Sequence, residues 1–194
     1  MINKFLNSYL INIQNKIESF ESKKILEIIG IIKKIKKSKN KVIIYGNGGS
    51  ASTASHFSTD LTKNARIRSI NFNESNLITC FSNDYGFENF VSQSIKEFSD
   101  KGDLVILISV SGESKNLINA AKYCIKNKIK LITLTGRIKN NSLHRLNRNS
   151  NNIFVDSKSY NTVEICHHII LLTIVDCIIG NKDYGTEIGK IKNW

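Results

Sequence analysis

The sequence predicts an α/β fold, a doubly wound parallel sheet flanked by helices, with an N-terminal helical extension. Short runs of β-branched apolar residues alternate with longer amphipathic segments, a pattern typical of parallel βαβ units with right-handed crossovers. Clusters rich in glycine or serine directly follow two of the apolar runs. The chain has 194 residues, a length that suits one domain with a substantial core.

The first part of the chain predicts two helices. Residues 2–38 have apolar side chains at helical spacing, and the pattern breaks near Ser22, so we expect two amphipathic helices with a bend at residues 21–23. We expect this pair to lie outside the sheet and to bury its apolar stripe against a neighbouring subunit. Residues 1–194 are thus expected to form one domain, in which residues 1–38 serve oligomerisation.

Predicted strands and helices alternate along the rest of the chain. The predicted strands cover residues 41–45, around 76–80, 104–109, 130–135 and 152–155. The predicted helices cover residues 52–63, 87–98, 114–127 and 163–179. The last helix is strongly apolar, which indicates burial on several sides and is consistent with a subunit interface.

Composition argues against a membrane or secreted protein. No apolar run approaches the roughly 20 residues needed to span a bilayer, and the first residues lack the pattern of a secretory signal. The 4 cysteines are far apart and form no CxxC pair, which is typical of thiols in a reducing compartment. We therefore expect a cytoplasmic protein with no membrane partner.

The charge of the chain is strongly positive, with a formal net charge of +12. Such a balance can indicate a nucleic-acid partner. The lysines are scattered among Ile and Asn, however, and the chain has no Pro, a composition typical of AT-rich coding bias. The densest lysine run, residues 33–39, ends a predicted helix, where cations complement the helix dipole. No aromatic residues interleave with it to stack on bases, so we do not expect a nucleic-acid partner.

Two loops that follow predicted strands have the residues of an anion site. The glycine loop reads Gly-Asn-Gly-Gly-Ser over residues 46–50, and the serine loop reads Ser-Val-Ser-Gly-Glu-Ser over residues 109–114. Glycines let the backbone approach an anion, which helix N-terminal N–H groups and serine hydroxyls can then bind. The glycine loop is neither a complete dinucleotide fingerprint nor a P-loop. Residues 82–86, after another predicted strand, offer polar groups to the hydroxyls of a polyol.

In this combination the motifs resemble the sugar isomerase (SIS) domain family. The glycine loop with His56, residues 83–87, the serine loop and residues 134–136 are most similar to the phosphoheptose isomerases, which convert sedoheptulose 7-phosphate into glycero-manno-heptose 7-phosphate. The resemblance covers nearly the whole chain and implies an SIS fold and a homotetramer with active sites between subunits. The candidate substrate-binding residues are Asn47, Gly48, Gly49, Ser50, Asn83, Asp84, Ser109, Val110, Ser111 and Ser114.

The resemblance also implies an isomerisation through an enediol, in which an acid/base pair moves a proton between adjacent carbons of the sugar. The family's glutamate falls at Asp60, which is one methylene shorter. His56 lies four residues earlier on the same helix face. Some members of the family hold zinc, and His56 and Asp60 are the candidate metal ligands here. Alternatively, His56 is a helix residue that makes a hydrogen bond at a subunit interface.

The last predicted helix departs from the family pattern. Val163 stands where the family has a glutamine ligand, and Leu171 stands where it has the catalytic histidine. Neither side chain can bind a metal or transfer a proton, so the implied zinc site is incomplete. His167 lies one turn from Leu171 on the same face and is a candidate displaced acid/base, whereas His168 is turned about 100° away. Alternatively, His167 is a satisfied polar residue at an interface.

Two functions follow from these residues. The first is a sugar-phosphate isomerase of the heptose pathway, or one acting on a related ketose phosphate, that feeds surface polysaccharide synthesis. The second is a non-catalytic sugar-phosphate sensor or adaptor, like the replication-initiator-associating proteins, which share the fold and also depart from the isomerases at the catalytic histidine. The retained binding motifs favour a ligand-binding role, for which an adaptor has no physical need, and the loss of the histidine favours the sensor or adaptor. Of the two, we expect the isomerase.

Overall fold

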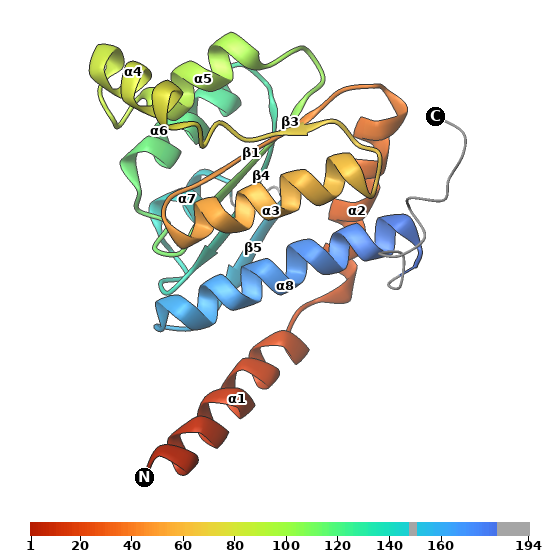
Figure 1. Cartoon of the computed structure of the whole chain (residues 1–194), viewed down its shortest axis with the longest axis vertical. Helices are drawn as coiled ribbons and strands as arrows, with labels where there is room; N and C mark the ends of the chain where they lie inside the picture. Colours follow the sequence, from red (N-terminus) through yellow and green to blue (C-terminus); the bar gives the residue numbers. More distant parts are fainter. Residues whose placement is uncertain (148–150, 182–194) are drawn as a thin grey trace.

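A parallel sheet with helices on both faces forms the body of the protein (Figure 1), in a computed structural model that describes residues 1–147 and 151–181. The strands are β1 (Val42–Gly46), β2 (Ser69–Ile70), β3 (Leu104–Ser109), β4 (Lys130–Gly136) and β5 (Asn151–Val155). The helices are α1 (Ile2–Glu18), α2 (Ser22–Lys37), α3 (Gly49–Lys63), α4 (Ser75–Tyr85), α5 (Phe90–Phe98), α6 (Lys115–Lys126), α7 (Ser142–Leu146) and α8 (Tyr160–Ile179). The sheet order is β2-β1-β3-β4-β5 and every pairing is parallel, as the α/β prediction requires.

Side chains of the central strands point alternately into two hydrophobic layers. In β1, Val42 and Ile44 belong to the layer formed with α2, α3 and α8. Ile43 and Tyr45 belong to the layer formed with α5, α6 and α7. Both faces of these strands are therefore buried, which explains why they form continuous apolar runs in the sequence.

The two N-terminal helices have different environments. In α2, Ile32 and Ile35 are fully buried in the layer that also contains α3 and α8, so the expectation that both helices lie outside the sheet is wrong for α2. Helix α1 projects from the body (Figure 1), and none of its residues is buried. The chain breaks between the helices at residues 19–21, next to the predicted bend.

Residues 76–80 form part of helix α4 and not the predicted strand. Ile78 and Phe81, three residues apart, pack from one helix face against the layer that contains α5. A short apolar run does not by itself distinguish a strand from a helix. The fifth strand is instead the two-residue β2, which pairs in parallel with Val42 and Ile43.

Helix α8 has the length and the mean hydropathy, 1.8, that would allow it to cross a membrane. It packs instead against α2, α3 and the sheet. Ile170, Leu171 and Ile174 on this helix belong to the same hydrophobic layer as β1 and α3. Its apolar composition is therefore that of a core helix.

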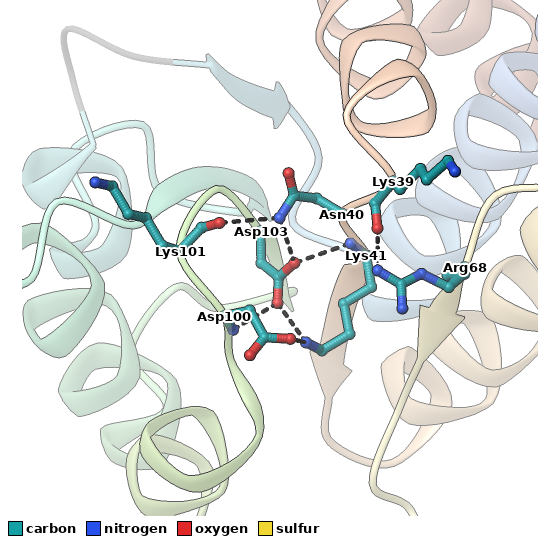
Figure 2. Close-up of polar contacts among 7 residues, drawn as sticks. All are labelled: Lys39, Asn40, Lys41, Arg68, Asp100, Lys101 and Asp103. Carbon is teal, nitrogen blue, oxygen red and sulfur yellow. Dashed lines mark hydrogen bonds and ion pairs between the residues drawn. The ribbon is translucent and has the colours of Figure 1, made fainter.

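A buried polar cluster joins the starts of β1 and β3 (Figure 2). The Asp103 carboxylate accepts hydrogen bonds from the backbone N–H groups of Lys41, at 2.9 Å, and Asp100, at 2.8 Å, and it pairs with the Lys41 ammonium at 2.6 Å. Burial alone would raise the pKa of Asp103, but these hydrogen bonds and the charge of Lys41 outweigh it and hold the pKa below its ordinary value. The cluster fixes β1 against β3 at the amino-terminal ends of the two strands, whereas the glycine and serine loops follow their carboxyl ends.

Candidate functional site

The glycine and serine loops lie together at the switch point of the sheet. Strands β1 and β3 are neighbours, whereas β2 lies on the other side of β1. The helix that follows β1 packs on one face of the sheet, and the helix that follows β3 packs on the other. In doubly wound folds, ligands bind in the crevice outside the carboxyl ends of the strands at this point.

The glycine loop makes a turn that requires small residues. Gly48 has a φ of +54°, in the left-handed region that favours glycine. A Cβ on Gly46 would lie 2.5 Å from the backbone of Ser50, and a Cβ on Gly49 would lie 2.5 Å from the carboxylate of Glu164. Ser50 itself is buried in the first turn of α3. The turn therefore brings the backbone of the loop to the N-terminus of α3, where an anion binds favourably.

A pair of asparagines connects the two loops. The Asn47 amide donates to Asn116 Oδ1 at 3.0 Å, and the Asn116 amide donates to Asn47 Oδ1 at 2.9 Å. Asn116 is buried in the first turn of α6, and the sequence analysis did not single it out. The signal was its position one turn before Ala120, which places a polar residue on the apolar face of an amphipathic helix.

The hydroxyls of the serine loop gather at the start of α6. Ser109 Oγ accepts from the backbone N–H of Gly112 at 3.1 Å and donates to Ser114 Oγ at 3.3 Å. Ser111 is partly exposed, and its hydroxyl accepts from the backbone N–H two residues later at 3.2 Å. The side chain of Val110 is buried in a small apolar cluster with α8, so only its backbone faces the loop.

A cavity of about 480 Å³ opens between the loops. Its lining residues are Asn47, Gly86, Phe87, Glu88, Ser114, Lys115 and Asn116. Asn83 and Asp84 do not line it: they are exposed near the end of α4, where the Asn83 amide donates to Asp84 at 3.0 Å. The structure thus brings Asn47 and Ser114 together at the cavity, and the chain that follows α4 reaches it in place of the two polyol candidates.

Polar side chains continue from the glycine loop along α3. His56 Nε2 lies 3.4 Å from Asp60 Oδ2, and the two side chains are 48% and 19% exposed. The Asn64 amide donates to the other Asp60 oxygen at 2.9 Å. The i, i+4 spacing therefore brings His56 and Asp60 together as the sequence predicts, in a position that solvent reaches.

His168 of α8 joins this row, contrary to the placement expected from the sequence. Its Nδ1 lies 3.3 Å from the Thr53 hydroxyl, and its ring centroid lies 5.0 Å from that of His56. Burial lowers the pKa of His168 and the charge of His56 lowers it further, whereas the charge of Asp60 opposes both effects. Thr53, His56, Asp60 and His168 form what we call the acid/base cluster.

His167 lies on the side of α8 that faces the sheet. It is fully buried, its Nε2 donates to the carbonyl oxygen of Thr135 at 3.2 Å, and its Nδ1 has no hydrogen-bond partner among the described residues. Burial lowers the pKa of His167 to about 4, so the ring is neutral at pH 7. The structure does not bring His167 together with Asp60, and the pairing expected from the sequence needs correction.

The side chains present do not fit a zinc centre. Zinc sites in proteins use three or four nitrogen, oxygen or sulfur ligands. His56 and Asp60 provide two, and His168, whose ring centroid lies 5.0 Å from that of His56, does not complete a three-ligand group with them. Val163 and Leu171 are buried apolar side chains. Across residues 1–147 and 151–181, no group of three or more His, Cys, Asp or Glu residues is arranged to hold a metal ion.

The chain belongs to the SIS domain family, whose sequence model matches residues 7–136, and the sheet order 2-1-3-4-5 agrees with this assignment. Within that family it is phosphoheptose isomerase-like. It is 38% identical over 138 residues to the phosphoheptose isomerase of Buchnera aphidicola subsp. Schizaphis graminum. The aligned residues cover 69% of this chain and 68% of that protein. It is 28% identical over 192 residues to that of Shewanella halifaxensis, covering 95% of each.

A solved structure agrees with this assignment at the level of the fold. The phosphoheptose isomerase GmhA from Neisseria gonorrhoeae superposes with a TM-score of 0.84 at 22% sequence identity. The match covers 93% of this chain and 100% of that one. The two proteins therefore share the same fold.

Proposed function

We propose that this protein is an aldose–ketose isomerase that converts sedoheptulose 7-phosphate into D-glycero-D-manno-heptose 7-phosphate. The observation that supports this most is that α3 begins at the glycine loop and presents Asp60 about three turns later, so one helix links the proposed anion site to the acid/base cluster. The similarity to proteins named phosphoheptose isomerase supports the choice of a seven-carbon sugar phosphate.

The phosphate would bind between the N-termini of α3 and α6. The backbone of Gly48 and Gly49 can approach it closely, and helix N-terminal N–H groups favour an anion there. The hydroxyls of Ser109, Ser111 and Ser114 complete the set of donors. Asn47, held by Asn116, lines the cavity between the loops and is placed to bond the sugar.

The isomerisation moves a hydrogen between C1 and C2 of the open-chain sugar. A base removes a proton from C1 while a proton is added to the oxygen on C2, which gives the enediol; a proton then leaves the oxygen on C1 and one is added to C2, so none is consumed overall. We assign the carbon proton to Asp60. We assign the oxygen protons to His168, which Thr53 holds in place and which replaces His167 in this role.

The protein is further proposed to act as a cytoplasmic homotetramer whose product enters surface polysaccharide synthesis. Apolar residues of α1 are at least half exposed, a feature typical of a surface that another subunit covers. They are Ile2, Phe5, Leu6, Leu10 and Ile11. Residues 1–18 would then serve oligomerisation, whereas α2 serves the core of its own subunit.

The test is incubation of the purified protein with sedoheptulose 7-phosphate, with and without added zinc. We expect heptose 7-phosphate to form in both reactions, because the acid/base cluster does not need a metal. Formation only in the presence of zinc would overturn the assignment of the proton transfers to side chains alone.

A second function is favoured by one specific observation, the burial of apolar Val163 and Leu171 at positions where the family has polar groups. A sugar-phosphate sensor or adaptor needs the loops and not the proton transfers. If no heptose forms while sedoheptulose 7-phosphate still raises the melting temperature, this function replaces the first.

A further inference from the structure

We infer that Glu113 is a positioning residue that holds the serine loop in its phosphate-binding shape by anchoring it to Ser142 of α7. The inference rests on the proposed function in one respect, that the ligand of the loop is a phosphate ester. Glu113 lies between two of the three serines whose hydroxyls face the ligand, yet it is not among the residues that line the cavity.

Both oxygens of the Glu113 carboxylate accept hydrogen bonds from Ser142. Oε1 accepts from the backbone N–H of Ser142 at 2.8 Å, and Oε2 accepts from the Ser142 hydroxyl at 2.7 Å. Arg145 donates to the same hydroxyl at 3.0 Å. The hydrogen bonds from Ser142 and the charge of Arg145 hold the pKa of Glu113 below its usual value, so the anchor stays ionised at pH 7.

The backbone of the serine loop is fixed to the same segment of the chain. The N–H of Leu143 donates to the carbonyl oxygen of Gly112 at 3.0 Å, and the N–H of Gly136 donates to that of Val110 at 3.0 Å. Gly112 has a φ of +67°, and a Cβ on it would collide with the side chain of Asn141. Residues 136–143 therefore form the support against which the loop takes its shape.

This arrangement has two consequences for a bound phosphate. The serine loop is held to residues 136–143 at Val110, Gly112 and Glu113, so the hydroxyls of Ser111 and Ser114 are presented with little loss of loop freedom on binding. The negative charge of Glu113 is directed to donors on α7 and away from the ligand, where it would repel the phosphate. Release of the anchor would weaken phosphate binding and leave the acid/base cluster, which lies on α3 and α8, unchanged.

The experiment compares Glu113→Ala, Glu113→Gln and Ser142→Ala with the unaltered protein. We expect Glu113→Ala to raise the dissociation constant for inorganic phosphate and the KM for sedoheptulose 7-phosphate by about tenfold, with little change in kcat, because a charge-assisted bidentate contact is lost. Ser142→Ala keeps the backbone donor and should have a smaller effect. The double variant Glu113→Ala/Ser142→Ala should match Glu113→Ala alone, since both changes remove the same contact.

Two controls separate positioning from general stability. Glu97→Gln removes an exposed glutamate of α5, paired with Lys96 at 3.6 Å, and should leave both constants unchanged. Glu113→Gln keeps the shape of the side chain and can keep both hydrogen bonds, because the Ser142 hydroxyl can also accept, but it removes the negative charge. A folded Glu113→Gln protein should therefore bind phosphate more weakly than the unaltered protein, by less than Glu113→Ala does. Thermal melting checks that each variant is folded.

The inference is overturned if folded Glu113→Ala and Glu113→Gln bind phosphate as tightly as the unaltered protein. It is equally overturned if kcat falls while KM is unchanged, or if the effects of Glu113→Ala and Ser142→Ala add. Phosphate titration does not need turnover. An unaltered protein that binds phosphate without isomerising the sugar, together with weak binding by Glu113→Ala, would contradict the proposed function and support the anchor.

Discussion

His167 and His168 are neighbours in the sequence, but the protein places one ring in its interior and the other beside Thr53 and His56. Side chains adjacent on a helix point about 100° apart, so a rotation of α8 by one residue decides which histidine meets α3. The alignment of α8 on the family pattern indicated the wrong one. The sequence does not contain the missing information, which is the angle at which α8 packs on α3.

His168→Gln tests the role of this histidine. Glutamine can keep a hydrogen bond to Thr53 but cannot exchange a proton, so we expect kcat to fall by about 100-fold or more while KM changes little. Steady-state kinetics with sedoheptulose 7-phosphate measure both constants. Thr173→Ala changes an exposed residue of the same helix and should have no effect. A kcat that stays within twofold in His168→Gln would remove His168 from the mechanism.

Several elements were predictable because their residue pattern fits only one type of secondary structure. The core strands are continuous apolar runs that end at glycine or serine, and the structure confirms β1, β3, β4 and β5 near the predicted bounds. The short strand β2 has only two residues, too few for a periodic signal. Helix α4 was mistaken for a strand because its apolar residues are few, and this error also placed Asn83 and Asp84 at a strand end.

The loops were found from their composition, whereas Asn116 and Glu113 act through contacts that only the fold creates.

The pairing of β1 with β3 depends on the cluster around Asp103. The Asp103 side chain is fully buried against the Lys41 side chain, which is 13% exposed. Asp103→Ala therefore removes the carboxylate that accepts from two backbone N–H groups and pairs with a nearly buried ammonium. We expect a loss of about 3 kcal/mol in the free energy of unfolding at pH 7, measured by urea denaturation. The neighbouring carboxylate of Asp100 is exposed, and Asp100→Ala should cost less than about 1 kcal/mol.

The same cluster gives a dependence on pH. The pKa of Asp103 is lower in the folded protein than its ordinary value of 3.8, so the folded state favours the ionised carboxylate. Its contribution is fully present above pH values near the unfolded pKa and is lost as the pH falls through the lower, folded pKa. Urea titrations at falling pH should show this loss in the unaltered protein and its absence in Asp103→Ala. Equal acid sensitivity in the two proteins would contradict it.

At the scale of the whole molecule, α1 is the feature that one subunit does not explain. Replacement of Leu6 and Leu10, one turn apart and both exposed, by glutamate should convert the proposed tetramer into smaller species without unfolding the body. Size-exclusion chromatography with light scattering measures the mass, and circular dichroism checks the fold. Ser8→Glu with Asn12→Glu adds the same charge to the same helix and is the control. An unchanged mass in the Leu6/Leu10 variant would show that α1 does not hold subunits together.

The glycine loop, the serine loop and the acid/base cluster make one prediction together, that a bound sugar phosphate exchanges hydrogen with water through an enediol. The most direct test is NMR spectroscopy of sedoheptulose 7-phosphate in D₂O with the unaltered protein and with Asp60→Asn. We predict that heptose 7-phosphate accumulates with deuterium at C2, and that Asp60→Asn is at least about 100-fold slower. If the unaltered protein forms no heptose and exchanges no hydrogen while the sugar phosphate is bound, the protein is not an isomerase of this substrate.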